Sequence, residues 1–120
     1  MIQDVTELEV YKISLALIVA LNNLINLLPK TDFEMRSQLS RAGRSIPANI
    51  AEGFAKRKSA KEFKHFLTNA LGSSDELVTH FRVIYLEYPN LRESVTTLAP
   101  QYKVLSKRIN SLRSKWATNY

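Results

Sequence analysis

The chain has 120 residues, 45% hydrophobic and 23% charged, which excludes a disordered chain and suits a single domain over residues 1–120. Three glycines and four prolines are too few for the tight turns of a hairpin-rich β protein, so an all-α fold is favoured. The net charge of +6 suits an anionic partner, while the absence of cysteine excludes disulfides and thiolate metal sites and favours a cytoplasmic protein.

The first predicted helix spans about residues 6–28 and ends before Pro29, which restricts the residue before it and cannot donate a helical hydrogen bond. Twelve of the sixteen residues at 13–28 are apolar, and they point in nearly every direction around the helix. This stretch is shorter than the ~20 residues of a membrane-spanning helix and contains three asparagines, so we expect no membrane segment.

A helix that is apolar all round must be covered on more than one side, and a four-helix bundle covers roughly one. We therefore expect a second copy of the chain to cover the outer side of this helix, since large exposed apolar patches are rare. The alternative is that a terminus of the same chain covers it. The residues expected at the oligomer interface are Leu17, Leu21, Leu24 and Leu28.

The second predicted helix spans about residues 33–56, after an N-cap at Thr31 or Asp32, and carries many small residues around Pro47. Glycine and proline inside a helix cost about 1 and 3 kcal/mol relative to alanine, so close packing against a neighbour should offset them. A polar stripe follows one face of this helix. Its members, with two residues of the next helix that could join them, are Arg41, Ser45, Asn49, Glu52, Ser73 and Glu76. A solvated face and a buried network or binding site both explain the stripe.

The third and fourth predicted helices span about residues 60–88 and 91–116, on either side of Pro89, and Ser59 and Glu62 have the spacing of a capping box. Apolar residues recur in both helices at alternating steps of three and four, the pattern of a bundle seam. The seam residues are Phe63, Leu67, Ala70, Ser74, Leu77, Phe81 and Ile84, then Leu91, Val95, Leu98, Tyr102, Leu105, Ile109, Leu112 and Trp116. Because short connections make neighbouring helices antiparallel, the sequence predicts an up-down-up-down four-helix bundle.

Residues that could carry catalysis are scarce in this sequence. His65 and His80 lie fifteen residues apart on one predicted helix, a separation of about 22 Å at the rise of an α-helix, so they cannot share a metal within one chain. No glycine-rich phosphate loop, nucleophile elbow or kinase signature is present. We therefore expect a protein that is not an enzyme and that has no metal site and no cofactor.

Positive charge is concentrated in two segments. Residues 30–64 hold nine basic against four acidic residues, and residues 94–120 hold five basic residues and no acidic one. In an up-down-up-down bundle the ends of helices two and four lie at the same pole, so the two segments would form one phosphate-binding surface. The alternative is that these cations only oppose the negative ends of helix dipoles. The candidate residues are Lys56, Arg57, Lys58, Lys61, Lys64, Lys103, Lys107, Arg108, Arg113 and Lys115.

Three strings carry a family resemblance: SIPANIAEG at 45–53, KEFKHFL at 61–67 and ALGSSDEL at 70–77. They resemble the four-helix-bundle proteins encoded in intervening sequences of bacterial 23S ribosomal RNA genes, a family similar in fold to the accessory variability determinants of diversity-generating retroelements. The resemblance implies a ring-shaped pentamer with a nucleic-acid role. It gives no catalytic role to the motif positions, which are Arg41, Ser45, Asn49, Glu52, Gly53, Gly72, Ser73 and Glu76. Pro100 departs from the family pattern, in which we expect no proline inside the final helix. We therefore expect the first turns of the fourth predicted helix of this chain to be kinked or separate.

Two functions are compatible with these features. The first is a homo-oligomeric bundle, a pentamer by resemblance, that binds RNA or DNA through backbone phosphates without reading bases, since no helix-turn-helix, ribonucleoprotein or zinc-finger pattern is present. The second is a protein-protein adaptor or assembly module whose partner is another protein. Charge reversal in the basic segments would abolish the first function and leave the second intact.

Overall fold

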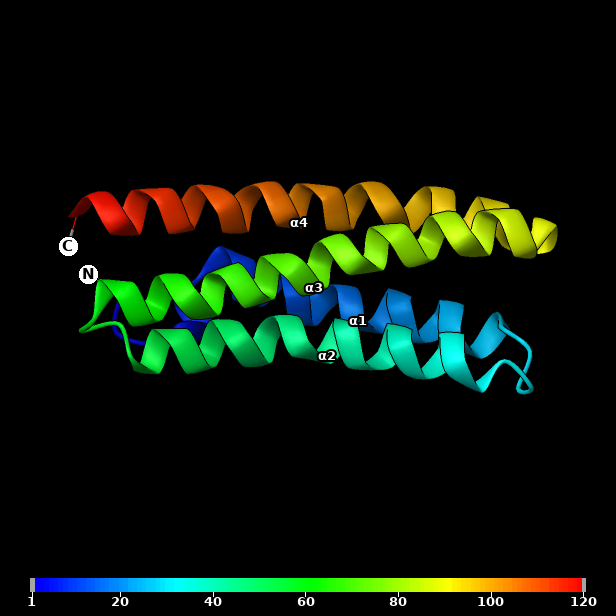
Figure 1. The fold of residues 1–120 in the computed structure, drawn as a ribbon, viewed down its shortest axis with the longest axis horizontal. Helices are drawn as coiled ribbons and strands as arrows, with labels where there is room; N and C mark the ends of the chain where they lie inside the picture. The colour runs from blue at the N-terminus through cyan, green and yellow to red at the C-terminus, as the bar shows by residue number, and fades with distance from the viewer. Residues whose placement is uncertain (1, 120) are drawn as a thin grey trace.

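The computed structural model describes residues 2–119, with side chains up to Trp116, and arranges them as four antiparallel helices (Figure 1). Within this range there are no strands, and each helix runs opposite to the next. The all-α, up-down-up-down four-helix bundle predicted from the sequence is confirmed. The elements in chain order are η1 (Val5–Glu7), α1 (Glu9–Leu27), α2 (Phe33–Ala55), α3 (Ala60–Glu87), η2 (Pro89–Leu91) and α4 (Arg92–Asn119).

Side-chain caps fix where the helices begin. The Asp32 carboxylate accepts a hydrogen bond of 3.1 Å from the backbone N–H of Met35 at the start of α2. The Ser59 hydroxyl accepts one of 3.1 Å from the N–H of Glu62 at the start of α3. The first helix differs from its prediction, because Leu8 is extended and separates the short η1 from α1.

The seams predicted on the third and fourth helices form the core. Every seam residue of α3 is buried, and so is every seam residue from Leu91 of η2 to Ile109 of α4, while Leu112 and Trp116 are partly buried. Aromatic rings join the two helices, with ring centroids 5.7 Å apart for Phe81 and Tyr102 and 4.7 Å apart for Phe63 and Trp116. Burying these side chains stabilises the bundle by about 25 cal/mol per Å² of apolar surface.

The four leucines predicted to form an oligomer interface do not lie on the outer side of α1. Leu17, Leu21, Leu24 and Leu28 are all buried in the chain's own core, with exposures of 6%, 1%, 2% and 2%. Their spacing of four, three and four makes them a bundle seam like those of α3 and α4. The prediction that these four leucines form an oligomer interface is therefore wrong.

Other apolar residues do face outward on α1. Leu15, Val19 and Leu27 are 44%, 66% and 57% exposed. Of the helices described, α1 alone is long and apolar enough to cross a membrane by length and composition, with a mean hydropathy of 1.6 over a window that is one third buried. In the bundle it packs against α2 and α4. The absence of a membrane segment stays a prediction.

Pro100 does not divide the last helix. α4 runs without a break from Arg92 to Asn119, and Pro100 is exposed on its surface. A proline within a helix removes one hydrogen bond to the carbonyl four residues earlier, here that of Thr96. On the outer side of a packed helix this loss leaves the helix continuous, so the expected separation of its first turns is not found.

The glycines of α2 and α3 occupy two kinds of site. A Cβ at Gly53 would lie 2.8 Å from the Phe66 Cβ and 2.9 Å from the Phe63 Cδ1, so the lack of a side chain lets α3 approach α2. A Cβ at Gly43 would clash with the Leu21 side chain of α1. A Cβ at Gly72 would meet nothing within 4 Å. The expected close packing around the small residues of α2 is therefore seen at two of these positions.

Alanine substitutions should separate these two kinds of site. Gly53→Ala should lower the free energy of unfolding by about 1 to 3 kcal/mol, because the added methyl group overpacks the contact with Phe63 and Phe66. Gly72→Ala should raise it by about 0.5 to 1 kcal/mol, because alanine restricts the unfolded chain and clashes with nothing. Urea denaturation followed by circular dichroism measures both. Equal effects at the two positions would contradict the packing described.

One buried hydroxyl lacks a partner. Within the described part of the chain the Tyr102 side chain is fully buried and its hydroxyl makes no hydrogen bond. Burial raises the pKa of this phenol well above its usual value near 10. Since the folded pKa is raised, its contribution to stability is complete below about pH 10 and is lost as the pH rises above that value.

Tyr102→Phe should stabilise the bundle. Removing an unsatisfied buried hydroxyl should raise the free energy of unfolding by about 1 kcal/mol at neutral pH. The variant should also lose less stability than the natural chain above about pH 10, because no phenol at this position ionises on unfolding. Denaturant titrations at neutral pH and at pH values above 10 test both parts. A less stable variant would show that the hydroxyl has a partner.

Candidate functional site

The basic ends of α2 and α4 lie together. In Figure 1 the end of α2, the start of α3 and the end of α4 share one end of the molecule, whose Cα atoms span 47 × 20 × 20 Å. We call this end the basic pole. It gathers seven of the candidate cations, from the α2–α3 connection, the first turns of α3 and the last turns of α4, which are Lys56, Arg57, Lys58, Lys61, Lys64, Arg113 and Lys115.

Four of these cations are exposed and have no partner within the chain. Among the described residues their side chains form no hydrogen bond, ion pair or ring contact. They are Lys58, Lys61, Lys64 and Lys115. An exposed lysine or arginine without a carboxylate partner keeps all its donors for an anion from outside.

The other three pole cations have partners within the chain. Lys56 lies 3.6 Å from the Glu52 carboxylate and 4.8 Å from the ring centroid of Phe66. Arg57 donates to the carbonyl of Phe54 at 3.0 Å, at the end of α2, and its guanidinium lies 4.0 Å from the ring centroid of the same residue. Arg57 therefore fits the alternative in which cations satisfy helix C-termini.

Arg113 also bonds within the chain, to Thr68 of α3 at 3.1 Å. On the other side of α4, Arg108 and Lys115 line a shallow groove with Leu8 and Glu9. The pole cations thus surround the end of the bundle on the α3 side and on the α1 side of α4, and no single face holds them all.

Lys103, Lys107 and Arg108 do not belong to the basic pole. Lys107 and Arg108 lie twelve and eleven residues before the end of α4, near the middle of the bundle, where neighbouring Ser106 bonds to Ser74. Lys103 lies sixteen residues before the end of α4, about 24 Å along the helix axis. Its side chain lines a groove between α3 and α4 together with Phe81, Arg82 and Tyr85. The prediction that Lys103, Lys107 and Arg108 lie with the last turns of α4 is wrong, because it rested on charge summed over the whole segment 94–120.

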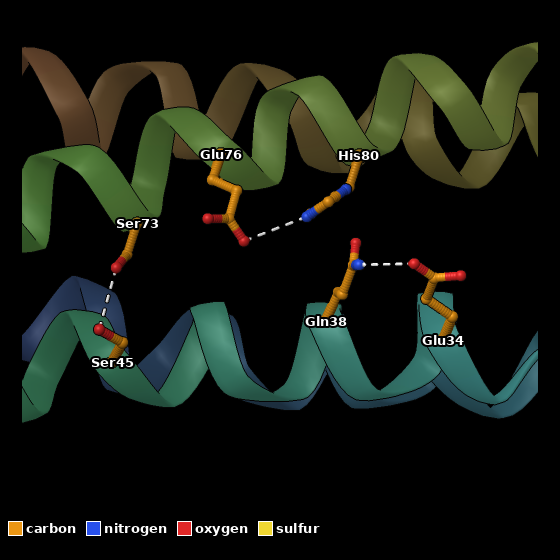
Figure 2. A network of polar contacts seen from close by, with 6 residues as sticks. All are labelled: Glu34, Gln38, Ser45, Ser73, Glu76 and His80. Carbon is orange, nitrogen blue, oxygen red and sulfur yellow. Dashed lines mark hydrogen bonds and ion pairs between the residues drawn. The ribbon is translucent and has the colours of Figure 1, made fainter.

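The motif residues meet where α2 packs against α3. The hydroxyls of Ser45 and Ser73 lie 2.9 Å apart (Figure 2). Asn49 donates from its side chain to the Ser45 hydroxyl at 2.9 Å and to the Ser45 carbonyl at 2.8 Å. The structure therefore joins these three motif residues in one half-buried polar network.

Beyond this network a polar cleft opens between the two helices. Arg41 and Glu76, the next motif residues, line it together with Gln38 and His80, and its volume is about 540 Å³. Figure 2 shows the side chains of Gln38, Glu76 and His80 directed into the space between α2 and α3. The imidazole of His80 lies 3.1 Å from a carboxylate oxygen of Glu76.

Three motif positions lie away from the cleft. Glu52 pairs with Lys56 at the pole, Gly53 contacts α3, and Gly72 is exposed with open space around it. The motif thus combines a packing contact, a polar network and one wall of a cleft. It is not a single site.

Three residues near the cleft were not predicted from the sequence to be part of a site. His80 lies four residues after Glu76, and the amide of Gln38 donates to Glu34, four residues before it, at 3.2 Å. Spacing of four places side chains on one helical face, so both pairs could have been found from the sequence. Among the described residues, no three His, Asp or Glu side chains are grouped closely enough to hold a metal ion.

Comparison with known proteins agrees with the motifs. No curated protein matches the chain. The family model for 23S rRNA-intervening sequence proteins matches residues 6–111, which include every helix core and all eight motif positions. The chain therefore belongs to the 23S rRNA-intervening sequence protein family.

Proposed function

We propose that this chain is a non-catalytic, cytoplasmic homo-oligomer that binds RNA or DNA through backbone phosphates at its basic pole. The observation that carries the proposal is the set of four exposed, unpaired cations at one end of a narrow bundle. Lysine and arginine at such a surface displace the counterions condensed on nucleic acid, which supplies affinity without sequence preference. A ring of subunits would repeat the same pole around one axis and strengthen its positive potential.

Two neighbouring lysines of the pole provide the first test. Lys58→Glu combined with Lys61→Glu should weaken binding to mixed-sequence RNA at least tenfold and lower the slope of log affinity against log salt by about two. The matched control combines Lys30→Glu with Arg44→Glu, which changes the net charge equally but lies outside the pole. Fluorescence anisotropy over a series of salt concentrations gives both values.

The results distinguish the two functions named from the sequence. Equal losses in the two double variants would mean that net charge alone drives binding and would contradict a role for the pole. Binding that is absent at low salt would remove the nucleic-acid proposal. A protein partner recovered from nuclease-treated extract by both variants would then favour the adaptor.

Two exposed apolar surfaces support the proposal that the chain forms an oligomer. One is the outer side of α1, with Leu15, Val19 and Leu27. The other is the groove between α3 and α4, about 330 Å³ in volume, where Tyr85 and Leu86 are 43% and 74% exposed. Wetting both surfaces is unfavourable by about 25 cal/mol per Å², and exposed patches of this kind mark interaction sites.

The two surfaces lie on different sides of the bundle. Both α1 and α3 pack against α2 and α4, so α1 and α3 are diagonal to one another. An interface that joins two different surfaces is heterologous, and repetition of it gives a ring when the rotation closes.

The two surfaces also match in height along the bundle. Residues 20–27 of α1 share a groove with residues 90–101 of η2 and α4, and the α3–α4 groove uses residues 95–103 of α4. In a ring whose axis runs along the helices, the outer side of α1 would therefore meet the groove of the next subunit.

A single acidic substitution on the outer side of α1 should disrupt this interface. Val19→Asp should convert an oligomer, a pentamer of about five times 13.7 kDa by family resemblance, into a monomer of 13.7 kDa, because an unpaired carboxylate would be buried against the groove. Phe33→Asp is the control, since Phe33 is 76% exposed on α2 and outside both surfaces. Sedimentation velocity measures the mass. A natural chain that sediments as a monomer would overturn the ring.

A further inference from the structure

The side chains that line the polar cleft between α2 and α3 satisfy only part of their hydrogen-bonding capacity within the chain. Its closed end is the network in which Ser45, Asn49 and Ser73 satisfy one another. From there the cleft opens between polar side chains of both helices (Figure 2). Its only apolar lining residue is Ala42, which is too short to fill it.

Two charged groups in the cleft retain free hydrogen-bonding capacity. In the described part of the chain the guanidinium of Arg41 has no hydrogen bond or ion pair. On the α3 side, Glu76 uses one carboxylate oxygen for His80 and leaves the other oxygen without a partner. His80 is 15% exposed against 56% for Glu76, so the less exposed imidazole holds the carboxylate in place.

The hydrogen-bonding groups of Arg41 and Glu76 indicate which kind of ligand the cleft can bind. Arg41 offers two or more donors in one plane, and Glu76 offers acceptors from the opposite wall. A complementary ligand presents two acceptors on one edge and two donors on another. Among the four nucleobases only guanine does so, with O6 and N7 as acceptors and N1–H and the N2 amino group as donors.

We propose that the α2–α3 cleft binds one unpaired guanine base, with Arg41 donating to O6 and N7 and Glu76 accepting from N1–H and the N2 amino group. His80 acts as a positioning residue that orients the carboxylate. Bases outside a duplex expose both edges at once, which is how single-stranded RNA is read by proteins.

The base can belong to a free nucleoside or to a nucleic acid. In the second case the inference rests on the proposed function, because the pole holds the strand. Arg41 precedes Lys56 by fifteen residues on the same helix, about 22 Å along its axis. A single strand held at the pole would need only a few nucleotides to reach the cleft.

Guanosine is the first probe because it has no phosphate and so avoids the pole. Equilibrium dialysis should show guanosine binding at least tenfold more tightly than adenosine, cytidine or uridine. Arg41→Ala and Glu76→Gln should each weaken guanosine binding about tenfold, the effect of losing one bidentate contact. The matched controls, Arg44→Ala and Asp75→Asn, remove similar exposed charges from the same helices outside the cleft and should leave binding unchanged.

Oligonucleotides with and without guanine separate this inference from the proposed function. If guanosine fails to bind and both oligonucleotides bind equally, the cleft assignment is overturned while the pole remains. Guanosine binding without salt-dependent oligonucleotide binding would sustain the cleft and remove the pole. Loss of guanosine binding in the control variants would overturn the roles given to Arg41 and Glu76. Circular dichroism of each variant identifies any that fail to fold.

Discussion

The antiparallel order of the helices is the constraint on which every surface of this protein depends. The connections between helices contain only a few residues, so each helix must return along the one before it. This order brings the ends of α2 and α4 to one pole, although Lys58 and Lys115 are far apart in sequence. A long crossover between α2 and α3, or between α3 and α4, would have placed the two basic segments at opposite ends of a 47 Å rod.

The close approach of α2 and α3 also determines the shape of the polar cleft between them. At Gly53 the helices touch through Phe63 and Phe66, and at Ser45 and Ser73 they touch through hydroxyls. Small residues at these points bring the backbones together, while longer polar side chains beyond them hold a cleft open. The unfavourable glycine and proline of this helix are thus linked to the shape of the cleft as well as to packing.

The features predicted correctly from the sequence are those that depend on helical periodicity and on the residues that begin and end helices. Every seam position of α3 and the caps at Asp32 and Ser59 are as expected, because helical spacing and capping are local properties. The direction of the α1 leucines was predicted wrongly, because in a helix apolar on nearly all sides their seam spacing is one of several apolar patterns. For the same reason the exposed Val19 was missed.

The three proposed surfaces are compatible in one assembly. A ring formed by α1 and the α3–α4 groove uses two sides of each bundle and leaves the α2–α3 side, with its cleft, uncovered. Because the ring axis runs along the helices, all the basic poles point the same way. A strand that follows the resulting circle of cations would pass the end of every α2 in turn. Each subunit could then offer its cleft to a base of the same strand.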